Sequence, residues 1–130
     1  MADVITLDGL SLTLEQLEQI ARGAPVELDK AARERMQKSR DLVDRVAAGD
    51  QPVYGINTGF GALAETPIAR ADLAKLQRNL VLSHAVGVGE PLSLEITRAL
   101  MALRANVLAR GVSGVRVAVV ERLIKLLNLN

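Results

Sequence analysis

Cysteine and tryptophan are absent from this 130-residue chain, and tyrosine, phenylalanine and histidine occur once each. The lack of cysteine excludes disulfides, thiolate metal ligands and a cysteine nucleophile. A metal site is not expected either, because one histidine and carboxylates scattered over helix faces do not make a ligand set. Acid–base chemistry by a phenol or an imidazole would therefore depend on Tyr54 and His84 alone.

An excess of charge of one sign and long apolar runs are also missing. Sixteen Lys and Arg stand against fifteen Asp and Glu, a formal charge of +1, whereas binding to nucleic acids or anionic membranes needs a dense basic surface. No run reaches the roughly 18 apolar residues of a membrane span, and the N-terminus lacks the segments of a secretory signal. We expect a cytoplasmic protein with neither nucleic acid nor membrane as a partner.

The composition and the helix signals that are present predict a mainly α protein with one domain over residues 1–130. Alternating apolar residues on either side of Asp8-Gly9 predict a short β-hairpin at the N-terminus. Caps and apolar periodicity then predict helices from Thr13 to Gly23, from Asp29 to Ala48, over 71–86, over 94–110, and from Ser113 to the end of the chain.

The last two predicted helices carry more apolar surface than the other helices can cover. The helix over 94–110 is apolar almost all round, which is typical of a helix buried in a larger helical assembly. Either the protein forms oligomers through these helices, or the chain is a piece of a longer one.

The stretch 50–68 lacks a helical period and is rich in glycine and proline, which predicts an ordered loop. Glycines at 55, 59 and 61 would let the backbone approach a ligand closely. A nucleotide loop is not favoured, because the stretch lacks both the Gly-Lys-Ser/Thr end of a Walker motif and the strand-to-helix context of a dinucleotide fingerprint.

Tyr54 and His84 each allow a structural and a functional interpretation. Tyr54 could be a half-buried ring with a satisfied hydroxyl, or a general acid or base; since a phenol has a pKa of about 10, a base would need neighbours that favour phenolate. His84, near the end of a predicted helix, could cap that helix, lie satisfied in the core, or bind a ligand.

Several separated motifs, most specific over residues 52–116, together resemble the N-terminal part of the aromatic amino-acid ammonia-lyase family, and most closely its histidine-cleaving branch. The motifs follow one another in the family's order and are Tyr54 to Gly61, Leu76 to Leu80, Ser83-His84, Gly87 to Pro91, Leu103 to Gly111, and Ser113 to Arg116.

This resemblance implies a helical N-terminal domain of the ammonia-lyase/aspartase-like fold and a homotetramer. It implies that Tyr54, on the Gly-rich active-site loop 50–68, transfers a proton, and that Ser83, His84 and Gly61 bind the substrate. The Ser-His pair points to histidine, which would lose ammonia to give trans-urocanate, because a histidine side chain can hydrogen-bond an imidazole. The family's electrophile is methylidene-imidazolone (MIO), which forms when an internal Ala-Ser-Gly cyclises and loses water.

The chain departs from the family in one large respect, because it contains no Ala-Ser-Gly and its Ser113-Gly114 follows Val112. MIO cannot form from this chain, so we expect an N-terminal segment of a lyase that is inactive alone. The alternatives are a non-catalytic helical oligomerisation or interaction module, and the N-terminal part of a tyrosine or phenylalanine ammonia-lyase or aminomutase.

Overall fold

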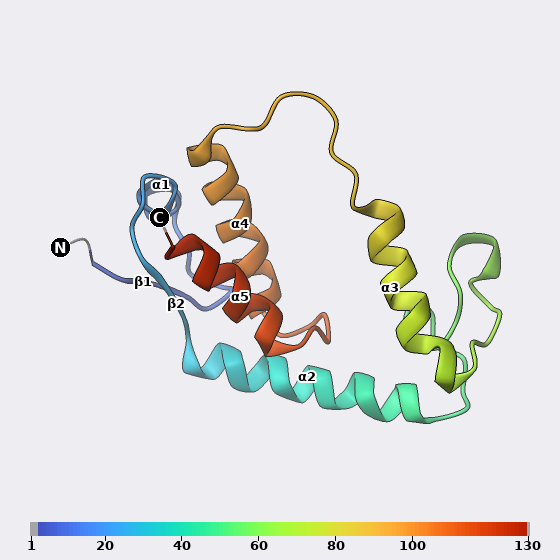
Figure 1. Ribbon diagram of the computed structural model, residues 1–130. Coiled ribbons are helices and arrows are strands. Elements are labelled where there is room, and N and C mark those ends of the chain that lie inside the picture. Colours follow the sequence, from blue (N-terminus) through green and yellow to red (C-terminus); the bar gives the residue numbers. More distant parts are fainter. Residues whose placement is uncertain (1–2, 130) are drawn as a thin grey trace. The chain divides into compact units, whose positions relative to one another are not determined.

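The computed structural model describes residues 3–129, which divide into two compact units (Figure 1). The first unit comprises the described residues up to Asp41 and from Pro91 onward, and the second comprises Leu42–Glu90. Within the described chain the elements are β1 (Ile5–Leu7), α1 (Leu14–Ala21), β2 (Val26–Leu28), α2 (Lys30–Ala48), the 3-10 turns η1 (Gly61–Leu63) and η2 (Arg70–Asp72), α3 (Leu73–His84), α4 (Leu94–Ala109) and α5 (Val117–Leu127). The prediction of a mainly α fold is confirmed.

The core of the first unit lies where α4 packs against both α1 and α5 (Figure 1). Ala102, Ala105 and Ala109 of α4 are fully buried, and their small side chains let the neighbouring helices approach. The largest fully buried apolar side chains of this core come from β1, α1, α2 and α5, and they are Leu7, Ile20, Met36, Val120 and Leu127.

One charged side chain, Arg98 of α4, is buried in this unit with 6% of its surface exposed. Its guanidinium donates to the carbonyl oxygens of Ile20 at 2.8 Å, Leu127 at 2.6 Å and Ala24 at 3.4 Å. Ile20 and Leu127 lie at the C-terminal ends of α1 and α5, where carbonyls have no partner within the helix and the helix dipole is negative. Arg98 thus binds the ends of two helices at once and shares the Ile20 carbonyl with the N–H of Gly23.

Three predicted helix starts are confirmed by their caps. The hydroxyl of Thr13 accepts the N–H of Gln16 while the Gln16 side chain accepts the N–H of Thr13, a complete capping box. Asp29 accepts the N–H of Ala32 at 2.7 Å at the start of α2. Ser93 caps α4 through the N–H of Ile96.

The predicted start of the last helix at Ser113 was wrong, because α5 begins at Val117. The N–H of Gly114 donates to the Ser39 hydroxyl at 3.0 Å, and its carbonyl accepts from Arg40. These bonds to α2 hold the backbone around Ser113 in a turn, so Ser113 cannot cap a helix there.

The predicted β-hairpin was also wrong, because β1 pairs in parallel with β2, with Ile5 opposite Val26 and Leu7 opposite Leu28. The chain does turn at Asp8-Gly9, but Gly9 has φ +82° and donates its N–H to the Asn106 side chain of α4. A Cβ on Gly9 would lie 2.5 Å from the backbone nitrogen of Arg110, so this turn is pressed against α4. After this turn the chain enters α1, which provides the crossover that a parallel pair requires.

The side chain of Asn128 pairs with β2 as a neighbouring strand would. Its Oδ1 accepts the N–H of Val26 at 2.9 Å, and its Nδ2 donates to the carbonyl of the same residue at 2.8 Å. Both polar groups of Val26 are thereby satisfied, and the end of α5 is tied to β2.

The turn after β1 makes stability depend on pH through Asp8. The carboxylate accepts the N–H groups of Leu10 and Ser11 and the hydroxyl of Ser11, which lowers the pKa of Asp8 from 3.8 to about 2. Since the folded-state pKa is depressed, this stabilisation is present above about pH 4 and is lost as the pH falls towards 2.

Asp8→Asn should therefore lower the urea midpoint at pH 7, and the difference in midpoint between this variant and the unmodified chain should shrink between pH 4 and 2. Asp3→Asn, at an exposed carboxylate, is the control; a difference independent of pH would contradict the assignment.

Candidate functional site

The Gly-rich loop of the second unit closes on itself, which confirms the prediction of an ordered loop. Thr58 forms an isolated antiparallel bridge with Pro67, and the N–H of Gly59 donates to the Thr66 carbonyl at 3.0 Å. Thr58 is almost fully buried, with 1% of its surface exposed. The loop is therefore a framework that can hold a side chain in place.

Tyr54 lies on this loop with 64% of its surface exposed. Its ring packs edge-on against the ring of Phe60, with centroids 5.9 Å apart and planes at 73°. Such exposure does not match the half-buried structural role that was one of its two interpretations. The ring is held on one side, and the rest of the phenol remains accessible.

Ser83 and His84 form the end of α3, and both are exposed. The Ser83 hydroxyl donates to the Leu80 carbonyl at 2.8 Å, while His84 Nδ1 lies 2.9 Å from that carbonyl and 3.0 Å from the Ser83 oxygen. A carbonyl oxygen only accepts, so these distances require a proton on Nδ1. In neutral His84 this leaves Nε2 as a hydrogen-bond acceptor, suited to a ligand that presents an N–H group.

We expect His84 in the neutral state to carry its proton on Nδ1, whereas free histidine in water favours Nε2. The ¹⁵N chemical shifts of the imidazole measure this directly, and the single histidine of the chain needs no assignment. Ser83→Ala should reduce the Nδ1–H population, because Nδ1–H loses one of its two acceptors. A spectrum dominated by the Nε2–H form would contradict the geometry.

Gly61, the third predicted substrate-binding residue, begins η1 with φ +57°. A Cβ at this position would meet nothing within 4 Å, so glycine is required by its conformation and not by crowding.

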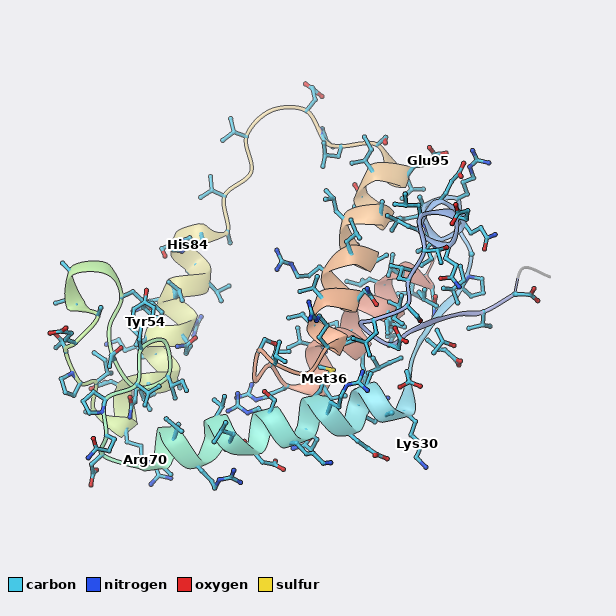
Figure 2. The ribbon with its side chains drawn as sticks, turned by 180° about the vertical axis from the view of Figure 1, so that it is seen from behind. Lys30, Met36, Tyr54, Arg70, His84 and Glu95 are labelled. Carbon is cyan, nitrogen blue, oxygen red and sulfur yellow. The ribbon has the colours of Figure 1, made fainter. Side chains whose placement is uncertain are left out.

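The predicted site residues all lie in the second unit, but they do not form one hydrogen-bonded cluster. Figure 2 shows Tyr54 on the loop and His84 at the end of α3. Within residues 3–129, the ring contact of Tyr54 is to Phe60, whereas the hydrogen bonds of His84 are to Leu80 and Ser83. The structure therefore holds the Tyr54 ring and the His84 imidazole through separate sets of contacts.

The glycine spacing did not reveal Asn57, which is a functional candidate in this loop. Asn57 is only 7% exposed, and its side chain bonds three backbone groups nearby in sequence. The available signal was an asparagine within a glycine-rich turn, because such residues often bond the local backbone.

The Ser113-Gly114 step does not fit the prosthetic tripeptide that the family resemblance implies. Val112 occupies the alanine position, and the Gly114 nitrogen already donates to Ser39 from within the turn before α5. Within residues 3–129, no three His, Asp or Glu side chains gather closely enough to hold a metal ion. Nor does any helix among those residues have the length and apolar composition needed to cross a membrane.

Known proteins resemble this chain in both sequence and structure. The family model described as aromatic amino acid lyase matches residues 12–130. The histidine ammonia-lyase of Myxococcus xanthus is 57% identical over 125 residues, which are 95% of this chain and 25% of that protein. Among solved structures, the histidine ammonia-lyase from Trypanosoma cruzi has a TM-score of 0.87 at 41% identity, covering 97% of this chain and 25% of that one. A tyrosine aminomutase from Streptomyces globisporus has a TM-score of 0.91 at 35% identity, covering 98% and 24%. The chain thus spans about a quarter of the length of the curated relatives it matches.

Proposed function

Because the chain belongs to the aromatic amino acid lyase family, we propose that it forms the N-terminal part of a histidine ammonia-lyase, which eliminates ammonia from L-histidine to give trans-urocanate. The observation that carries this proposal is sequence identity. Several curated histidine ammonia-lyases are 46–57% identical to the chain, whereas the tyrosine aminomutase is 35% identical. Fold similarity does not discriminate, because both kinds of enzyme have TM-scores near 0.9.

The chemistry of the second unit supports histidine as the substrate. An acceptor nitrogen on His84 can bind the N–H of a substrate imidazole, a bond that the phenyl ring of phenylalanine cannot make. Tyr54 presents an accessible hydroxyl on an ordered loop, and in the proposed reaction it moves a proton at the substrate amine or the β-carbon. Gly61 and Ser83 complete the proposed substrate-binding set.

These side chains are not sufficient for the elimination. The β-proton of histidine is weakly acidic and its amine is a poor leaving group, so an electrophile must activate the substrate. The family resemblance implies MIO for this task, and these 130 residues lack the Ala-Ser-Gly that forms it. We propose that the chain acts together with a segment that supplies this tripeptide, within a cytoplasmic homotetramer that serves histidine catabolism.

The test compares the chain alone with a chimera. In the chimera, residues 12–130 replace the matching segment of the Myxococcus xanthus enzyme. We expect no urocanate from histidine with the purified chain, and urocanate formation at a rate close to that of the parent enzyme with the chimera. A chimera that prefers tyrosine or phenylalanine would favour the alternative substrates. Urocanate formed by the chain alone would overturn the requirement for Ala-Ser-Gly.

A non-catalytic oligomerisation module is the second candidate, and a specific observation favours it. Large apolar side chains of α4 remain exposed within the described chain, among them Leu94 at 72%, Leu100 at 53% and Val107 at 54%. Sedimentation of the purified chain at several concentrations tests this candidate, because a monomer at all concentrations would exclude self-association.

A further inference from the structure

The turn that carries Tyr54 is held by a single buried amide, that of Asn57. Its Oδ1 accepts the N–H of Val53 at 2.7 Å. Its Nδ2 donates to the carbonyl of Gln51 at 2.9 Å and, at 3.4 Å, to that of Gly49. One side chain with 7% exposure thus binds the backbone on the N-terminal side of Tyr54 at three points.

The main chain of Asn57 closes the same turn. Its N–H donates to the carbonyl of Val53 at 3.2 Å, and its carbonyl accepts from the N–H of Ile68 at 2.9 Å, across the loop. Val53, which directly precedes Tyr54, therefore has both of its polar backbone groups bound to Asn57. The peptide that leads into Tyr54 cannot rotate without breaking these bonds.

The Tyr54 ring is restrained separately, by its edge-on contact with Phe60. Its backbone and one side of its ring are thus fixed, while 64% of the residue stays exposed. Such an arrangement suits a group that must meet a reacting atom, because a displacement of about 1 Å can cost about a hundredfold in rate.

We infer that Asn57 is a positioning residue for Tyr54, acting through the turn of residues 53–57. This inference rests on the proposed function, in which Tyr54 transfers a proton. Asparagine is the residue type that the contacts require, since Oδ1 accepts while Nδ2 donates twice. Aspartate keeps the shape and the acceptor but loses both donated bonds, and alanine loses all three.

The chain itself allows a direct test, because it contains one tyrosine and no tryptophan. Its intrinsic fluorescence therefore reports on Tyr54 alone, and time-resolved anisotropy measures the motion of the ring on the nanosecond scale. We expect Asn57→Asp and Asn57→Ala to add a fast component to the anisotropy decay and to increase quenching by acrylamide.

Glu65→Gln is the matched control, since it exchanges an acid and an amide at an exposed position of the same loop. It should leave both signals unchanged. Circular dichroism identifies a variant that fails to fold, and Asn57→Asp, which preserves shape, is the variant expected to retain the helices. Unchanged anisotropy in a folded Asn57→Asp chain would overturn the inference.

The chimera tests the consequence for the reaction. Asn57→Asp should lower kcat about ten- to a hundredfold with little change in KM for histidine. In a Tyr54→Phe background it should have little further effect, because it acts through the missing hydroxyl. An equal loss in both backgrounds would make Asn57 merely structural. An inactive unmodified chimera would overturn the proposed function, while the anisotropy would still decide whether Asn57 fixes Tyr54.

Discussion

Replacing Tyr54 by phenylalanine in the chimera should lower kcat for histidine by about 10²–10⁴-fold, the usual contribution of a positioned general acid or base. Phenylalanine keeps the ring and its edge contact with Phe60 and removes only the hydroxyl. The turn that carries Tyr54 depends on hydrogen bonds of Asn57 and of the backbone, which the substitution leaves in place. The loss should therefore arise from the chemical step and not from folding.

Steady-state urocanate formation measures this loss, and circular dichroism with a thermal melt verifies that the fold is intact. Glu34→Gln, at an exposed position of the first unit, is a control that should retain normal turnover. If the Tyr54→Phe chimera turned over histidine at a near-normal rate, Tyr54 would have no place in the mechanism.

The second large effect is expected at Arg98, and it concerns stability. Arg98→Met retains much of the side-chain volume but removes the donors to Ile20, Ala24 and Leu127. The Ile20 carbonyl would keep the N–H of Gly23, whereas the carbonyls of Ala24 and Leu127 would be left without a partner, at a cost of about 1–3 kcal/mol each. We expect a loss of roughly 3 kcal/mol in the free energy of unfolding, because water can reach part of the vacated site.

Urea unfolding followed by circular dichroism measures this loss in the 130-residue chain. Arg104→Met is the matched control, because Arg104 lies on the same helix but is exposed, and its change should stay within about 0.5 kcal/mol. Equal effects of the two substitutions would mean that the bonds of Arg98 contribute nothing measurable.

Features coded by neighbouring residues could be predicted from the sequence, and those that depend on distant ones could not. The caps at Thr13, Asp29 and Ser93 bond residues three positions away, so local patterns were enough. The prediction at Ser113 was wrong because the next residue bonds Ser39, 75 positions earlier. The hairpin prediction failed likewise, since the turn at Gly9 is set by Asn106 of α4.

In the candidate site, likewise, the residues could be predicted from the sequence but the contacts that hold them could not. The motifs identified Tyr54 and Ser83-His84 as candidates, and the structure adds how each is held. The tautomer of His84 follows from its distance to the Leu80 carbonyl, which no spacing reveals. Asn57 has no signature beyond its residue type, because its importance depends on burial and on three simultaneous bonds.

The first unit is built from two separate stretches of the chain, and this has a consequence for its synthesis on the ribosome. This unit joins the described residues before Leu42 with those after Glu90. The carbonyl groups of Ala24 and Val26 therefore lack their side-chain donors until Arg98 and Asn128 have been made. At about 5–20 residues per second, Asn128 follows Val26 by roughly 5–20 s. The second unit is continuous in sequence and can close during that interval, so the loop that carries Tyr54 can form before the unit that begins the chain.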